Sequence, residues 1–190
     1  GWLVLSGPSG SGKTHLAAAI VSECVSRGYP SFYITAPDLL DHLRSTYSPD
    51  SEMPYGDFFN QVRDTPLLVL DDLGAQTGTP WAKEKLDQLL THRFNNKLPT
   101  VIIPIIPLDQ LEDRLRTRFT DRELSQICMV EEKRPLSLDY TWDPEFELQK
   151  SMTFNNFDWR RLNLPPEQRE NLEQAYRLAF DFAKSPEGWL

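Results

Sequence analysis

The chain has 190 residues, a typical size for one domain built around a single hydrophobic core. Twenty Lys and Arg residues against 28 Asp and Glu residues give a formal net charge of −8, which excludes a protein whose whole surface coats nucleic acid but leaves room for a local basic patch. No apolar run reaches the roughly 18 residues of a membrane span and no charged-then-apolar leader precedes the first apolar segment, so we expect no membrane contact and no export.

Five short apolar segments, each bounded by glycine, proline or polar residues, are predicted to be strands. They cover residues 2–5, 32–35, 67–70, 101–103 and 127–130. Helical patterns lie between and beside them, at about 13–27, 37–46, 54–63, 80–95 and 108–118. Short, continuously apolar runs are typical of strands buried on both faces of a parallel sheet. The alternation therefore predicts an α/β fold with a parallel sheet flanked by helices.

The alternation stops after residue 130. Residues 133–150 contain two prolines and mixed charge without a clear period, and we interpret them as a linker. A helix is then predicted from Pro165 and Pro166 to about Lys184, with apolar residues on one face. That face contains Leu172, Ala175, Tyr176, Ala179, Phe182 and Ala183. We expect a core at 1–132, a linker at 133–150, and a segment at 151–190 that packs back on the core, either of its own chain or of a neighbouring copy by domain swapping.

A phosphate-binding loop follows the first strand. The residues "GPSGSGKT" match G-x-x-x-x-G-K-[ST] in full, and a helical pattern follows them. Glycines allow the backbone to bend around a phosphate, and the exposed N–H groups at a helix N-terminus attract anions. Lys13 can reach the β and γ phosphates, and the Thr14 hydroxyl can ligate Mg²⁺. The expected ATP-binding residues are Gly7, Pro8, Ser9, Gly10, Ser11, Gly12, Lys13, Thr14 and His15.

Two adjacent acids, Asp71 and Asp72, are predicted just past the third apolar segment. A carboxylate there can hold a water on the Mg²⁺ bound by Thr14, and its neighbour can polarise the attacking water. We assign Asp71 to the metal and Asp72 to the water, although a solvated turn is the alternative interpretation. The separation from the loop also predicts that another strand lies between the two strands that carry these motifs.

An arginine-rich helix is predicted near residues 108–118. It and the residues that follow carry Arg114, Arg116, Arg118 and Arg122. Arg114 and Arg118 are four residues apart and share a helix face, and arginine is suited to a bidentate grip on phosphate. The alternative is surface pairing with Asp109, Glu112, Asp113 and Asp121, and spacing alone favours neither.

These motifs together resemble the AAA+ helicase-loader family of the DnaC/DnaI type, with its IstB-like ATP-binding relatives. The resembling stretches are "GPSGSGKTHLAAAI", "LLVLDDLGAQ", "WAKEKLDQLLTHRFNNKLPTVI" and "LDQLEDRLRTRF", within residues 1–131. The resemblance implies an ATPase with a P-loop fold that assembles head to tail on a replicative helicase or on DNA, as a nucleotide-dependent homo-oligomer. It also implies that Arg118, supported by Arg114, reaches the neighbouring subunit's γ-phosphate.

The chain departs from the family pattern in two main respects, and the first concerns the residue that follows the fourth strand. The family has a polar residue, often Asn, after the fourth strand, whereas Ile105 stands there in "TVIIPIIPLDQ". An aliphatic side chain cannot orient water, so we expect ATP binding with weak hydrolysis. The helical lid that follows in the family is short or missing here.

The other departure is the order of segments. Residues 152–190 resemble the segment that precedes the phosphate-loop strand in the family, so the chain has a circularly permuted order relative to it. The order is compatible with a natural permutation, an engineered chain or a piece of a tandem chain. Phe154, Asn156 and Phe157 are candidates for the adenine side, and hydrophobic anchoring is the alternative. "GWL" occurs at both 1–3 and 188–190, and we expect residues 1–5 to form the phosphate-loop strand.

Single-stranded DNA is a possible partner by resemblance. The candidate contacts are Arg44, Tyr47, Tyr55, Phe58 and Phe59, although the two phenylalanines also fit a hydrophobic core. Two other functions compete with a loader: a P-loop small-molecule kinase, and an interaction module that binds ATP without turning it over. Cys24 and Cys128 have no metal-ligand spacing, and we expect buried thiols in a reducing, cytoplasmic compartment.

Overall fold

The computed structural model describes residues 1–46, 55–74, 79–130, 152–158 and 165–186. A parallel sheet lies at its centre, with strands in the order β2-β3-β4-β1-β5. The strands are β1 (Trp2–Ser6), β2 (Ser31–Thr35), β3 (Leu67–Leu73), β4 (Thr100–Pro104) and β5 (Ser125–Met129). The predicted α/β fold with a parallel sheet is confirmed.

The strand β4 lies between β1 and β3. Thr100 at its start is in register with Trp2 of β1 and with Leu68 of β3. The predicted intervening strand is therefore confirmed. Because the three strands are parallel and in register, their carboxyl ends meet at one edge of the sheet, where ligands bind in open α/β sheets.

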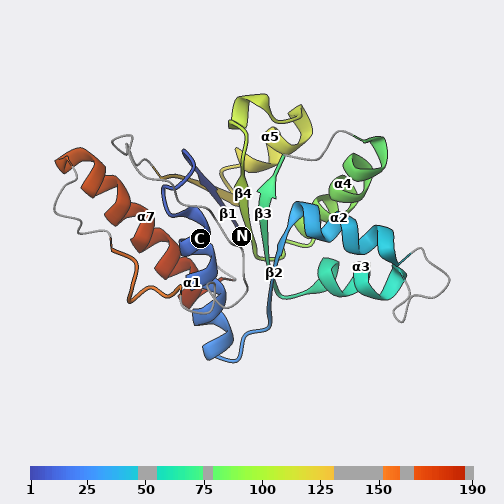
Figure 1. Ribbon diagram of the computed structural model, residues 1–190, viewed down its shortest axis with the longest axis horizontal. Helices are drawn as coiled ribbons and strands as arrows, with labels where there is room; N and C mark the ends of the chain where they lie inside the picture. The colour runs from blue at the N-terminus through green and yellow to red at the C-terminus, as the bar shows by residue number, and fades with distance from the viewer. Residues whose placement is uncertain (47–54, 75–78, 131–151, 159–164, 187–190) are drawn as a thin grey trace.

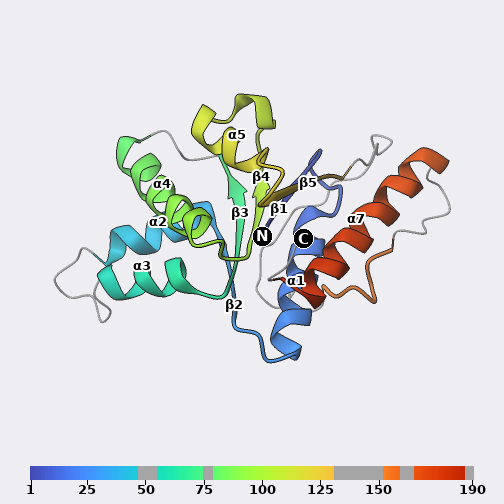
Figure 2. The ribbon, with the colours of Figure 1, turned by 180° about the vertical axis from the view of Figure 1, so that it is seen from behind.

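Helices cover both faces of the sheet. Figures 1 and 2 show α1 (Lys13–Ser26) and α7 (Pro166–Lys184) on one side, and α2 (Ala36–Ser45), α3 (Tyr55–Asp64) and α4 (Pro80–Asn95) on the other. Side chains alternate between these layers, since Leu3 and Leu5 join the core on the α1 side and Trp2 and Val4 join the core on the α4 side. Both faces of the sheet are thus buried, as the apolar strands predicted.

The prediction of a continuous helix over residues 108–118 is wrong in its first half. The chain forms a 3₁₀ turn, η1 (Leu108–Gln110), and then a separate helix, α5 (Asp113–Phe119). Leu111 between them has an extended backbone and is buried in the core on the α4 side. Drawing this side chain into the core turns the chain and prevents a continuous helix.

The helix α7 packs on the core of the same chain. Its buried residues are Leu172, Ala175, Ala179, Phe182 and Ala183, which belong to the predicted apolar face. The Cys24 thiol at the end of α1 donates to the Ala183 carbonyl at 3.4 Å, and the Asn171 amide donates to the Met129 carbonyl of β5 at 2.8 Å. The expected core-packing face is confirmed, while the boundaries at 132 and 151 stay a prediction.

Several expectations fall on residues outside the described ranges. The linker at 133–150, Tyr47 and the second "GWL" at 188–190 are among them. The first copy contributes Trp2 and Leu3 to β1, as expected. Cys24 and Cys128 are both buried free thiols, and burial raises the pKa of each to about 11. Within the described ranges, no helix has the length and apolar character needed to cross a membrane.

Candidate functional site

The loop Gly7–Thr14 connects β1 to α1 in a conformation that requires glycine. Gly7 and Gly12 have φ values of +142° and +100°, which L side chains rarely adopt. A Cβ on Gly7 would lie 2.0 Å from the Val130 carbonyl oxygen, and one on Gly12 would lie 2.9 Å from the Phe157 ring. The loop is therefore packed tightly against Val130, the residue after β5, and against the segment 152–158.

Two polar side chains in the loop suit an anion. The Lys13 ammonium donates to the carbonyl oxygens of Gly7 at 3.0 Å and Pro8 at 2.7 Å. Burial lowers the pKa of Lys13, and the charges of Asp71 and Asp72 oppose that shift. The buried Ser11 hydroxyl has no hydrogen-bond partner within the described residues. An unpartnered hydroxyl beside a lysine ammonium that is held by two backbone carbonyls of the loop fits a phosphate ligand.

Asp71 connects the loop to the end of β3. Its Oδ2 accepts from the Thr14 hydroxyl at 3.0 Å and from the Tyr33 hydroxyl at 2.5 Å, while its Oδ1 accepts from the Asp72 N–H at 2.7 Å. The side chain is buried, with 3% exposure. Burial and the adjacent carboxylate of Asp71 raise the pKa of Tyr33 well above its usual value, so Tyr33 remains a donor. The carboxylate is thereby fixed next to Thr14, and the two residues can serve one cation.

Asp72 is exposed whereas Asp71 is buried, and it lies where β3 is irregular. The pairing of β3 with β4 shifts register between Leu70 and Leu73, and Asp72 has a φ of +54°. Bulges re-aim side chains beside active sites, and Asp tolerates the left-handed region better than most residues. Burial, then the charges of Asp71 and Asp38, raise the pKa of Asp72, and Lys13 opposes them. Both aspartates lie within the strand rather than past it, which corrects the sequence expectation.

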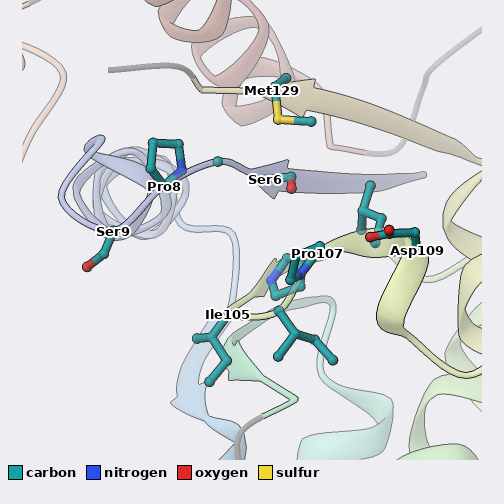
Figure 3. Close-up of a pocket in the computed structure, with 11 residues that line it drawn as sticks. Ser6, Pro8, Ser9, Ile105, Pro107, Asp109 and Met129 are labelled. Carbon is teal, nitrogen blue, oxygen red and sulfur yellow. The ribbon is translucent and has the colours of Figure 1, made fainter. Parts of the chain in front are cut away.

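A pocket of about 580 Å³ lies beside the loop (Figure 3). It is lined by Ser6, Gly7, Pro8, Ser9, Pro104, Ile105, Ile106, Pro107, Leu108, Asp109 and Met129. Ile105 follows β4 directly, is 49% exposed, and donates its N–H to the Leu73 carbonyl at 3.0 Å. Residue 105, where the resemblance led us to expect a polar side chain, therefore lies beside the phosphate loop with an apolar side chain.

The arginines of α5 pair within the protomer, but not mainly with the acids that the sequence suggested. Arg118 donates to Asp87 at 3.1 Å and to Thr91 at 2.7 Å, and Arg114 donates to the other Asp87 oxygen at 3.1 Å. Only Arg116 has the expected kind of local partner, Asp113. The Arg118 side chain is 15% exposed and that of Arg114 is 77% exposed. One carboxylate on α4 thus holds both arginines.

The segment 152–158 touches the start of α1. A His15 ring nitrogen, Nε2, lies 3.0 Å from the Thr153 carbonyl oxygen and 3.1 Å from the Asn156 amide oxygen, and the ring meets Phe157 edge to face at 5.2 Å. Phe154 and Phe157 are buried and pack with Tyr176 of α7. These contacts show hydrophobic anchoring of the segment, and contact with adenine stays a prediction.

The side chains proposed as contacts for single-stranded DNA are engaged with other residues of the chain where the structure describes them. Phe59 is buried in the core, and Phe58 packs edge to face on Phe32 and His42. Arg44 pairs with Asp41 and lies over the Trp81 ring at 5.1 Å. The two phenylalanines therefore follow the core interpretation.

Sequence reasoning missed Tyr33. The signal was present, because Tyr33 belongs to a predicted strand next to the acidic one, and a long aromatic side chain reaches diagonal neighbours on the adjacent strand. The missing information was the register of β2 against β3, which pairs Thr35 with Asp71 and Tyr33 with Val69.

A parallel sheet in this strand order, a phosphate loop after β1 and paired acids at the end of β3 define a P-loop nucleotide-binding domain of the AAA+ class. Residues 2–129 match the family described as IstB-like ATP binding protein, and the chain belongs to that family. The resemblance predicted from the sequence motifs is thereby confirmed.

Known relatives are similar to part of this chain. It is 31% identical over 119 residues to the replicative helicase loader DnaC of Escherichia coli (strain K12), covering 63% of this chain and 48% of that protein. It is 32% identical over 111 residues to the replicative helicase loader DnaI of Bacillus subtilis (strain 168), covering 58% and 35%. The crystal structure of the DnaC helicase loader aligns with a TM-score of 0.54 at 26% identity, over 68% of this chain and 77% of that one. The chain thus spans about half or less of the length of these curated relatives.

Proposed function

We propose that this chain is the ATP-binding and ATP-hydrolysing core of a protein that assembles on a replicative helicase or on DNA in the cytoplasm. The observation that carries the proposal is the hydrogen bond between Thr14 and Asp71, which joins the phosphate loop to the acidic end of β3. The relatives named as replicative helicase loaders support the choice of helicase loading over other uses of ATP.

The residues divide the chemistry between them. The loop Gly7–Thr14 and the Lys13 ammonium would bind the phosphates, and Thr14 with Asp71 would hold Mg²⁺. When bound, Mg²⁺ neutralises charge on the β and γ phosphates. The exposed side chain of Asp72, next to Asp71 in β3, would orient and polarise the attacking water. Asp72→Asn should then abolish phosphate release and leave nucleotide affinity unchanged. Loss of both, in a folded variant, would contradict this division.

The role that the resemblance implies for Arg118, contact with the γ-phosphate bound by a neighbouring subunit, requires a second subunit. Arg118 lies on α5 with Arg114 one turn away, and Asp87 orients both. We propose that Arg118 acts on ATP bound by a neighbouring copy in a nucleotide-dependent oligomer. Steady-state hydrolysis measured against protein concentration, with and without single-stranded DNA, tests this proposal. Specific activity should rise with concentration, and a constant value would rule out action in trans.

The apolar side chain at 105 favours a second candidate function. Ile105 lines the pocket beside Gly7–Ser9 and cannot orient water, so the domain would bind ATP and use it to control assembly with little turnover. Ile105→Asn should increase phosphate release if this position limits hydrolysis. An unchanged rate would remove the argument. Sedimentation with a non-hydrolysable ATP analogue should show association in either case.

The segment 151–190 would take the place of the element that precedes the phosphate-loop strand in the family. Its contacts with His15 and Gly12, and the packing of α7 on α1, support this equivalence. His15, Phe154 and Phe157 would then border the adenine. Measuring ATP against GTP affinity in His15→Ala tests this, since a change in base preference is expected and equal losses for both nucleotides would contradict it.

A further inference from the structure

The hydroxyl of Tyr33 is aimed at the carboxylate that the proposed function assigns to Mg²⁺. It donates to Asp71 Oδ2 at 2.5 Å, and the same oxygen accepts from Thr14 at 3.0 Å. The second oxygen of Asp71 accepts from the Asp72 N–H at 2.7 Å. Three donors from three different elements therefore converge on one buried side chain.

The position of the Tyr33 ring is set by the sheet. Thr35 of β2 pairs with Asp71 of β3, so Tyr33 stands two residues back on the same face and reaches Asp71 along the diagonal. Its ring also packs against the core under α1. A ring held by core packing presents its hydroxyl in one place, which a flexible polar side chain would not do.

The chemistry of the three groups is compatible with a bound cation. The Thr14 oxygen keeps lone pairs available for a metal while its hydrogen points at Asp71. Tyr33 keeps its proton, so towards the carboxylate of Asp71 it acts as a donor. Donors behind a ligating carboxylate orient it, and losing one typically weakens metal affinity about 10- to 100-fold.

We propose that Tyr33 is a positioning residue for the divalent cation, holding Asp71 in the orientation in which it serves the metal together with Thr14. This inference rests on the proposed nucleotide and Mg²⁺ site and adds a residue on β2, outside the phosphate loop and the acidic strand end. Tyr33 acts through Asp71 and does not touch the nucleotide.

The experiment measures Mg²⁺ dependence rather than turnover. Fluorescent ATP analogue is bound to wild type, Tyr33→Phe and Tyr29→Phe, and Mg²⁺ is titrated from zero. Phenylalanine keeps the ring and its packing, so Tyr33→Phe removes only the hydroxyl. Its half-saturating Mg²⁺ concentration should rise about tenfold or more, while its nucleotide affinity in EDTA equals that of wild type. Tyr29→Phe removes a hydroxyl from a ring on the same core and should leave the Mg²⁺ midpoint unchanged.

A double-mutant cycle shows whether Tyr33 affects Mg²⁺ binding through Asp71. In an Asp71→Asn background, Tyr33→Phe should shift the Mg²⁺ midpoint no further. An unchanged midpoint in the single variant, or a full tenfold shift persisting without Asp71, would overturn the inference about Tyr33. If the nucleotide affinity of the wild-type protein does not depend on Mg²⁺, the proposed Mg²⁺ site itself is wrong. The experiment therefore distinguishes a failure of the Mg²⁺ site from a failure of the role of Tyr33.

Discussion

The contact between Gly12 and Phe157 offers a direct test of where the segment 152–158 lies. Gly12 has a φ of +100°, and a Cβ added there would approach Phe157 Cε2 to 2.9 Å. Gly12→Ala therefore combines two costs, an unfavourable backbone conformation and a clash with a buried ring. The second cost exists only if a residue 145 positions further along the chain packs on the phosphate loop.

The magnitude follows from those two costs. A non-glycine residue at positive φ costs about 1–2 kcal/mol, and overpacking a core costs about 1–3 kcal/mol. We expect Gly12→Ala to lower the free energy of unfolding by roughly 2–5 kcal/mol in total. For a chain of this size that corresponds to a fall in Tm on the order of 10 °C.

Urea unfolding followed by circular dichroism measures the effect, and Gly28→Ala is the matched control. Gly28 also has a positive φ, +77°, but nothing lies within 4 Å of an added Cβ, so only the backbone cost applies. In the double variant Gly12→Ala with Phe157→Leu, the smaller side chain relieves the clash. Its destabilisation should be less than the sum of the single values by about 1 kcal/mol.

Two results would refute the reasoning. Equal destabilisation by Gly12→Ala and Gly28→Ala would mean that no ring opposes the added methyl group. Strict additivity of Gly12→Ala and Phe157→Leu would mean that the two residues are not in contact.

Three further predictions follow from single residues. Folding raises the pKa of Asp72, so the folded state binds its proton more tightly and loses stability as the pH rises through the folded-state pKa. Asp72→Asn, whose asparagine also tolerates a positive φ, should be more stable than wild type at neutral pH. Thermal melts should show the difference in stability between the two proteins shrinking as the pH falls toward 3.8. A difference that does not depend on pH would contradict the raised pKa as its cause. Asp87→Asn should reduce concentration-dependent ATPase activity because it releases Arg118. The control Asp113→Asn breaks a more exposed pair on α5 and should leave that activity unchanged. Equal activities of the two variants would count against Asp87 as the group that orients Arg118. Arg93 is fully buried and makes five side-chain hydrogen bonds. Arg93→Met should therefore lower the free energy of unfolding, measured in urea, by at least about 3 kcal/mol. A loss below about 1 kcal/mol, the value typical of an exposed ion pair, would contradict this prediction.

Motifs that are contiguous in the chain could be predicted from the sequence. The loop Gly7–Thr14 is defined by residue types whose roles are local, namely glycines at positive φ and a lysine that folds back on its own loop. The five strands were found because each is apolar on both faces. Their order was predictable in one respect, the strand between the phosphate loop and the acidic end.

Features that depend on the pairing of distant segments could not be predicted. The left-handed backbone of Asp72 coincides with a register shift between β3 and β4, which no pattern within β3 encodes. Arg118 pairs with Asp87, 31 residues away on α4, whereas the acids considered as surface partners from the sequence all lay close to it in the chain.

The sequence by itself determined the chemistry available to this protein: a phosphate loop, two carboxylates and an aliphatic residue after the fourth strand. Only the tertiary structure decided how those groups meet, with Thr14, Tyr33 and Asp71 joined at one edge of the sheet and the segment 152–158 against the loop. The physical reason is range. Backbone conformation and side-chain type act over a few residues, whereas the packing and register that set distances between side chains are properties of the whole sheet and its two layers of helices.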